Sequence, residues 1–327
     1  MRAVLQKLLN ANLARVIVER GYDQVGGIVV EARDVTGLRT AGEIAEAFGF
    51  RDAPQFLDVV RFELPMCASL TRPVDTVQRN WPTYPSGFLN SSEIVPVWEL
   101  SRTRFSPGAE YWRIGADGSQ QLLSAYLGAA RGWKGARGWR PPSALVGTRA
   151  RWSGEDFTAD IAGEEVTLTR FAEVGGDGWN WSRPGVWTRQ VPLADCVVFE
   201  LVCMATLRGI PVRVLASDGQ ASHLQVTGSP EDAEALGAAM VEPGVFELGD
   251  VPMTDLSNQR WVANELSRPD SASTQLCACT QTAVQIVETR RRLAGVSISG
   301  RLRRKSDTVT EVAATIAMPE LLAWLFG

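Results

Sequence analysis

The sequence predicts an α+β protein, in which an N-terminal α+β domain is followed by two tandem small β modules and a short C-terminal helical segment. Three observations predict this fold. Apolar residues at helical spacing alternate with short β-branched runs over the first 140 residues, a β-type pattern occurs twice after residue 145, and an apolar run closes the chain. The expected boundaries are 1–140, 145–200, 201–266 and 270–327.

Two helices are expected in the N-terminal domain. Residues 1–20 carry leucines and valines at helical spacing, and Gly21 stands where a C-terminal cap would lie. A second helix is expected over residues 40–49, because Thr40 and Glu43 have the spacing of a capping box.

Strands are expected at 28–30 and 56–64, where β-branched and aromatic residues cluster. Residues 119–130 are expected to form a further helix. The stretch 131–142, rich in glycine, tryptophan and arginine, is expected to be a linker to the β modules.

The segment after this linker contains an internal repeat. Ala150–Phe157 aligns with Ala205–Val212 at an offset of 55, Gly163 and Leu168 with Gly219 and Leu224 at 56, Pro184–Trp187 with Pro243–Phe246 at 59, and Val191–Asp195 with Val251–Asp255 at 60. The shared positions are apolar residues, glycines and prolines, which a β unit needs for its core and turns. The growing offset indicates small insertions in loops, and the repeat predicts Trp187 as a core residue.

Helices are also expected around and after the second copy. Ser229, Pro230 and Asp232 have the chemistry of a helix start, and this short helix should end near Gly237. Further helices are expected at 255–266, 280–292 and 319–326, and residues 301–305 form a basic patch.

Composition excludes several classes of protein. The net charge of −4 argues against general nucleic-acid binding. No run reaches the roughly 18 apolar residues of a membrane span, and no signal peptide is expected. The five scattered cysteines favour reduced thiols in the cytoplasm over a disulfide framework.

Catalytic and metal motifs are missing. The one histidine, His223, lies in a predicted strand outside any motif, so we expect a half-exposed strand residue rather than a catalytic base. Cys277 and Cys279 lack the spacing of a zinc site, and there is no phosphate-binding glycine loop. We therefore predict no catalytic residue, no metal and no cofactor.

Two groups of arginines and aromatics are candidate binding residues, with core aromatics and solvated arginines as the plain alternative. An exposed tryptophan beside arginine is typical of an interface anchor. The first group lies in the linker and the second in the N-terminal domain: Trp133, Arg137 and Trp139; Arg61, Arg79, Trp81, Tyr84 and Trp112.

The repeats carry a resemblance. Residues 146–157, then Pro-Gly-Val-Trp leading to Val-Pro-Leu, and the matching Leu236-Gly237, Pro-Gly-Val-Phe and Val-Pro-Met, resemble uncharacterised actinobacterial proteins. Those proteins accompany toxin modules similar to the tuberculosis necrotizing toxin, an NAD glycohydrolase. The resemblance covers residues 145–262, consists of structural residues and brings no catalytic residue. It implies the context of an actinobacterial toxin or secretion system.

Two functions follow as hypotheses. The first is a non-enzymatic protein-binding protein, an immunity, chaperone or adaptor component, which acts in the cytoplasm on another protein such as a toxin or secretion component. The second is a glycohydrolase or ADP-ribosyl transferase acting on NAD through an arginine and a glutamate of the N-terminal domain. A nucleic-acid adaptor that uses the two basic patches is a third possibility.

Overall fold

The computed structural model describes residues 3–48, 52–72, 88–90, 93–242 and 244–266. Strands make up 53% of this part of the chain and helices 14%. Most strands belong to two antiparallel sheets, one of seven strands and one of eleven. The α+β prediction is therefore wrong, because the protein is mostly β. The predicted C-terminal segment, 270–327, lies outside the described residues.

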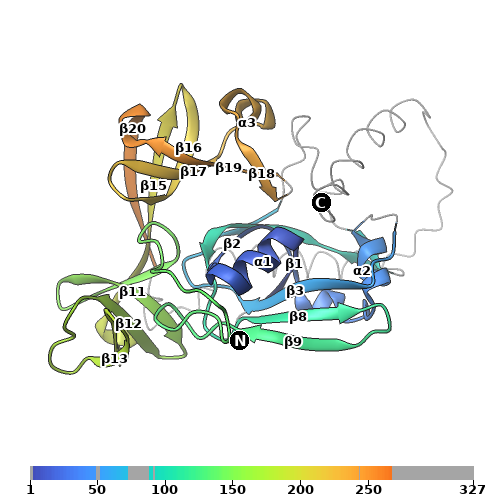
Figure 1. The fold of residues 1–327 in the computed structure, drawn as a ribbon, viewed down its shortest axis with the longest axis horizontal. Helices are drawn as coiled ribbons and strands as arrows, with labels where there is room; N and C mark the ends of the chain where they lie inside the picture. The colour runs from blue at the N-terminus through green and yellow to red at the C-terminus, as the bar shows by residue number, and fades with distance from the viewer. Residues whose placement is uncertain (1–2, 49–51, 73–87, 91–92, 243, 267–327) are drawn as a thin grey trace, which may run out of the picture.

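The seven-stranded sheet forms the N-terminal part, at the right of Figure 1. Its order is β4-β7-β2-β1-β3-β8-β9. Its strands are β1 Val4–Leu9, β2 Gln24–Glu31, β3 Phe56–Glu63, β4 Leu70–Thr71, β7 Val97–Arg104, β8 Glu110–Gly115 and β9 Gln120–Ala125, and a separate pair is formed by β5 Phe88–Asn90 and β6 Glu93–Val95. The helical elements are α1 Ala11–Arg20, the 3-10 turn η1 Ala32–Val35 and α2 Ala41–Ala47.

The two helices cover opposite faces of this sheet. Ile17 of α1 packs in one cluster with Val60 and Phe62 of β3. Ile44 of α2 packs in another cluster with Leu57 and Val59, which point the other way along the same strand.

The helix predicted over 1–20 is a strand followed by a shorter helix. Asn10 separates them, because its side chain accepts a hydrogen bond from the Leu13 N–H at 2.6 Å and caps α1. Gly21 ends α1 at φ 66°, as predicted. The leucines of β1 imitate helical spacing because β1 lies inside the sheet and is covered on both faces.

Of the other N-terminal predictions, the second helix and the two strands are confirmed, and a third helix is wrong. α2 has the predicted capping box, with Thr40 and Glu43 exchanging hydrogen bonds. The predicted strands correspond to β2 and β3. The helix over 119–130 is wrong, because a turn at Gly118 (φ 80°) starts β9, which pairs back on β8.

The eleven-stranded sheet contains both copies of the repeat. Its strands are β10 Thr148–Trp152, β11 Glu155–Ala162, β12 Glu165–Phe171, β13 Asn180–Arg183, β14 Val186–Pro192, β15 Val197–Leu207, β16 Ile210–Ser217, β17 Ala221–Val226, β18 Ala239–Glu242, β19 Val245–Pro252 and β20 Leu256–Glu265. The 3-10 turns η2 Leu193–Asp195 and η3 Met253–Asp255 and the helix α3 Pro230–Leu236 lie between strands. β15 belongs to both copies: its first half pairs with β10 and its second half with β16.

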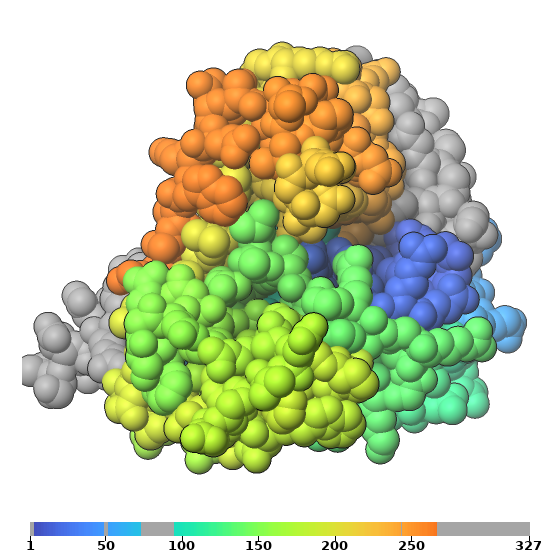
Figure 2. All heavy atoms as spheres, turned by 60° about the vertical axis from the view of Figure 1, so that its left-hand side comes forward, coloured from blue at the N-terminus to red at the C-terminus, as the bar shows by residue number. Residues whose placement is uncertain are grey.

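The two copies have the same succession of elements. β10, β11, β12, β13, β14 and η2 correspond to β15, β16, β17, β18, β19 and η3. Both first hairpins turn through two residues of positive φ, Ser153-Gly154 and Arg208-Gly209. Figure 2 shows the first copy, in yellow-green, below the second, in yellow and orange.

Only one of the three insertions in the second copy is a loop. The offset rises from 55 to 56 at a β-bulge between Val214 and Ala216, and from 59 to 60 at a bulge opposite Ser222 and Leu224. The rise from 56 to 59 comes from the connection that holds α3. This helix begins with the predicted capping of Ser229, whereas the helix predicted over 255–266 is the strand β20, paired with β15.

Candidate interaction surface

Trp133, predicted as an exposed anchor, is instead part of the N-terminal core. It is 4% exposed, and its indole Nε1 donates to the Tyr22 carbonyl at 2.8 Å. Its ring meets Phe105 edge-on at 5.1 Å and lies 5.3 Å from Tyr126. The predicted linker 131–142 therefore folds back on the N-terminal part, and Trp133 offers no surface to a partner.

Trp139 and Arg137 stay near the surface. The Arg183 guanidinium stacks over the half-buried Trp139 ring at 4.3 Å, and the Phe171 ring lies 6.4 Å away. Arg137 has an exposed side chain, and its backbone N–H donates to the Val18 carbonyl at 2.8 Å. Trp139 thus connects the N-terminal part to the first copy.

Arg61 and Trp112, two of the predicted binding residues, lie together on the N-terminal sheet. The guanidinium is 5.6 Å from the Trp112 ring and donates to Gln6 at 2.9 Å and to Gln120 at 3.1 Å. Burial lowers the pKa of Arg61. The remaining predicted members of this patch lie outside the described residues: Arg79, Trp81 and Tyr84.

A denser group of aromatics and arginines, which the sequence did not predict, lies at one end of the first copy. We call it the tryptophan surface. Its residues come from β10, β12, β13, β14 and the connection before β13: Trp152, Arg170, Trp179, Trp181, Trp187 and Arg189.

A cross-strand row forms the centre of this surface. Trp187 of β14 pairs with Trp181 of the edge strand β13 on one side and with Arg170 of β12 on the other. The Arg170 guanidinium lies 5.1 Å from the Trp179 ring and 5.9 Å from the Phe157 ring. Trp181 is 63% exposed, whereas Trp179 and Trp187 are half-buried. The row therefore leads from the core of the first copy out to solvent.

The two arginines of the surface differ in their partners. Arg170 donates to the Gly175 carbonyl and to Glu155, each at 3.1 Å. Arg189 stacks on Trp152 at 4.6 Å and donates to the Asp177 carbonyl at 3.3 Å, and it has no ion pair within the described part of the chain. A guanidinium stacked on an aromatic face keeps its in-plane donors for a carboxylate.

The repeat alignment did not predict this surface, because it predicts Trp187 as a core residue and treats the first copy as equivalent to the second. The signal was present at two diagonal positions on the neighbouring strands β12 and β14. Register places Arg170 and Arg189 where the second copy has Val226 and Leu248. The first copy therefore carries charged side chains at two positions that are aliphatic in the second copy.

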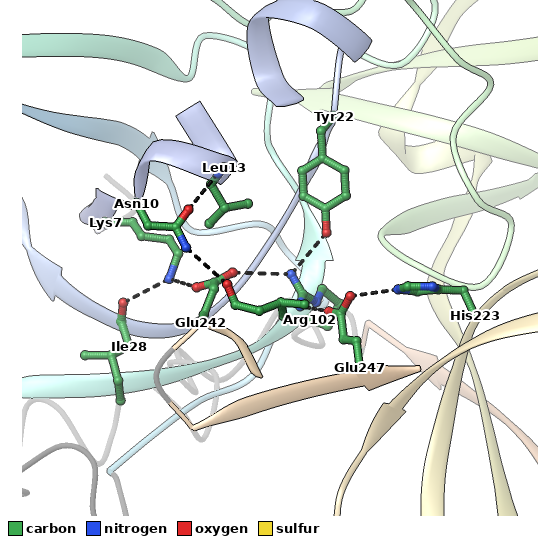
Figure 3. Close-up of polar contacts among 10 residues, drawn as sticks. Lys7, Asn10, Leu13, Tyr22, Ile28, Arg102, His223, Glu242 and Glu247 are labelled. Carbon is green, nitrogen blue, oxygen red and sulfur yellow. Dashed lines mark hydrogen bonds and ion pairs between the residues drawn. The ribbon is translucent and has the colours of Figure 1, made fainter. Parts of the chain in front are cut away.

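A buried charged cluster fixes the second copy on the N-terminal sheet (Figure 3). Lys7 pairs with Glu242, and Arg102 pairs with Glu247 and lies 3.7 Å from Glu242. His223 completes the cluster, with Nε2 2.7 Å from Glu247. The side chains of Arg102 and Glu242 are 1% and 3% exposed. Such paired charges hold two surfaces in one register.

His223 is a half-exposed residue of β17, as expected, and the structure adds its carboxylate partner. Burial acts to raise the pKa of Glu247, but hydrogen bonds from His223 and Arg102 outweigh burial, so this pKa lies below its ordinary value. Burial raises the pKa of Tyr22, whose hydroxyl accepts from Arg102 at 3.3 Å.

Arg104, two residues after Arg102 on β7, holds the first copy in the same way. It donates to the Ala159 carbonyl at 2.7 Å and lies 3.5 Å from Asp160. Burial raises the pKa of Asp160 despite Arg104. The cleft beside this pair has room for about 20 Å³, roughly one water molecule. Arg104, and not the cleft, joins the two parts through Ala159 and Asp160.

Within the described residues, no group of three or more histidine, cysteine or acidic side chains is arranged to hold a metal ion. Comparison with protein-family models, with characterised proteins and with solved structures finds no match for this chain.

Proposed function

We propose that this protein is a non-enzymatic protein-binding component that contacts its partner through the tryptophan surface. One observation carries the proposal: the first copy presents stacked tryptophans and arginines, with Trp181 63% exposed, and its Arg170 and Arg189 stand where the sister copy has Val226 and Leu248. Tryptophan and arginine dominate the energetic centres of protein interfaces. An adaptor, chaperone or immunity role in the cytoplasm, next to a toxin or secretion component, is the context that the repeat resemblance implies.

Charge favours a protein partner over a nucleic acid. Residues 145–200 contain five arginines and nine acidic residues. A nucleic-acid site needs a positive field along the phosphate backbone, and the acids of this copy oppose it. In the described part of the chain, no helix is long and apolar enough to cross a membrane.

An NAD-consuming enzyme is the second candidate, and one observation favours it. Arg61 and Glu110 are direct cross-strand neighbours on the N-terminal sheet, which gives an arginine and an acid side by side. The Glu110 carboxylate accepts from the Trp112 indole at 2.9 Å. Incubation with NAD distinguishes the two functions, because nicotinamide release that disappears in Glu110→Gln would establish the enzyme.

The binding function is tested by quantitative capture from cells of the source organism with three forms of the full chain. These are the unaltered protein, Trp181→Ala and Met240→Ala, the equivalent residue of the second copy, which is 37% exposed. We expect a stoichiometric partner that Trp181→Ala binds at least 30-fold more weakly, the effect of losing a central interface residue worth about 2 kcal/mol. Equal capture by all three forms would contradict the proposal.

A further inference from the structure

The strand β20, at the outer margin of the second copy in Figure 1, has an open edge within the described part of the chain. Among the described strands it pairs with β15 alone. The side chains of 257–261 and 263–265 are exposed, so neither face of the strand is covered. Trp261, in the middle of this edge, is 53% exposed. An open edge of this length is a template for pairing with another strand.

The pairing with β15 determines which backbone groups of β20 point to the open edge. The Leu266 N–H donates to the Val198 carbonyl at 2.8 Å, and the ladder is regular from there back to Arg260. Because hydrogen-bonded and non-hydrogen-bonded pairs alternate in an antiparallel ladder, the even-numbered residues of this stretch bond to β15. The N–H and C=O groups of Trp261 and Ala263 therefore point away from β15.

This edge is complementary to a second copy of itself in one antiparallel register. Outward-pointing residues must face one another, so a two-fold pair near the middle of the regular stretch is centred on Trp261, Val262 or Ala263. The register centred on Val262 sets apolar residues against apolar residues and polar residues against polar residues. Its pairs are Val262–Val262, Trp261–Ala263, Arg260–Asn264 and Gln259–Glu265.

The two neighbouring registers bring unlike side chains together. Centred on Trp261, the pair sets Arg260 against Val262. Centred on Ala263, it sets Trp261 against Glu265. Side-chain polarity therefore favours the register with Val262 at the two-fold axis, in which no two like charges face each other.

We infer that the edge of β20 is a homodimer contact, in which two copies of this chain pair antiparallel about Val262 and join their large sheets into one. The Ala263 N–H of each protomer donates to the Trp261 carbonyl of the other, and the Trp261 N–H donates to the Ala263 carbonyl. The inference goes beyond the proposed function and uses no residue of the tryptophan surface.

Sedimentation of the full chain tests the dimer. A strand edge alone makes a small interface, so we expect the mass to rise from one chain towards two as concentration increases through the micromolar range. Ala263→Pro removes the outward N–H and keeps the bonds to β15, so it should weaken dimerisation at least tenfold. Ala263→Val keeps this donor and is the matched control, which should dimerise as the unaltered chain does.

Crosslinking tests the register and does not depend on the proline variant. Facing residues of a non-hydrogen-bonded pair have Cα atoms about 4.5 Å apart, which a disulfide can span. With oxidised glutathione as the oxidant, Val262→Cys should form a disulfide between the two substituted residues, mapped by mass spectrometry. Trp261→Cys, which faces Ala263 of the other protomer, should form at least tenfold less.

Three outcomes would overturn the inference. The first is the mass of one chain at every concentration, and the second is a dimer that Ala263→Pro leaves unchanged. The third is equal crosslinking of the two cysteine variants, which would show chance collision in place of a fixed register. None of these results bears on capture of a partner through Trp181, so the proposed function is tested separately.

Discussion

The two copies of the repeat share their turns and cores but differ in the chemistry of their surfaces. The second copy covers its apolar end with α3, and Glu242 at the end of its edge strand β18 is buried against Lys7 of the N-terminal sheet. In the first copy the edge strand β13 has Arg183 at the position of Glu242, and its end is aromatic and partly open. Both copies are attached to the N-terminal sheet, but only the first has a large exposed aromatic side chain on its edge strand, Trp181.

The strand β7 explains how one scaffold serves both copies. Arg102 and Arg104 lie two residues apart, so they project from the same face of β7. Arg102 reaches the acids of the second copy and Arg104 reaches Asp160 of the first. These two neighbouring buried arginines therefore fix the first copy, with its tryptophan surface, relative to the second copy.

The largest expected effect is a difference in unfolding free energy between variants at two equivalent positions, Glu242 and Arg183. Glu242→Ala leaves Lys7 buried without its carboxylate, so unfolding free energy should fall by about 3–5 kcal/mol. Arg183→Ala removes a stacking contact with Trp139 at the rim, worth about 0.5–1 kcal/mol. Urea unfolding of both variants measures the difference. Equal losses of unfolding free energy would contradict the interpretation that Glu242 attaches the second copy while Arg183 lies at the rim of the first.

A smaller effect concerns the packing of the tryptophan surface. A Cβ at Gly175 would overlap the Trp187 ring, so Gly175→Ala should displace this ring and cost about 1–3 kcal/mol as overpacking. Gly249→Ala in the second copy is the control, because a Cβ there has only an ordinary contact with His223 at 3.7 Å. If thermal unfolding shows both variants as stable as the unaltered chain, Trp187 is not held as the structure shows.

Acid should affect the two attachments in opposite directions. The pKa of Glu247 is lowered on folding, so its contribution to stability is present above its unfolded value, near 4.5, and is lost as pH falls towards the folded value. The pKa of Asp160 is raised, so folding is favoured by protonation, and its contribution increases as pH falls through the folded value.

Denaturant unfolding measured from pH 7 to pH 3 tests this sign difference. Glu247→Gln should remove part of the loss of stability in acid, whereas Asp160→Asn should remove a gain. If the slope of unfolding free energy against pH changed in the same direction in both variants, the two attachments would respond to protonation alike.

Local chemistry was the part of the fold that the sequence could predict. Capping by Thr40, Ser229 and Gly21 was correct, because each depends on a few neighbouring residues. The helices expected at the positions of β1, β9 and β20 were wrong. Strand pairing across long separations decides these segments, and the apolar spacing of a doubly covered strand imitates a helix.

The candidate site was harder to predict for the same reason. Trp133 has arginines nearby in sequence, as an interface anchor would, but the chain returns to bury it beside Phe105. Trp181 and Trp187 become a surface only when β13 pairs with β14 at the sheet edge. Composition identifies tryptophan and arginine as candidates, and only the register decides which of them reach solvent.

The smallest expected effect on stability is the most informative about function. Trp181 is 63% exposed, so Trp181→Ala should change unfolding free energy by no more than about 0.5 kcal/mol, and so should Met240→Ala. A residue of this size that adds little to folding is available for another contact. Thermal unfolding and far-ultraviolet circular dichroism of both variants measure this difference. A loss of unfolding free energy above about 2 kcal/mol in Trp181→Ala alone would place Trp181 in the core of the first copy. It would then no longer be part of the tryptophan surface.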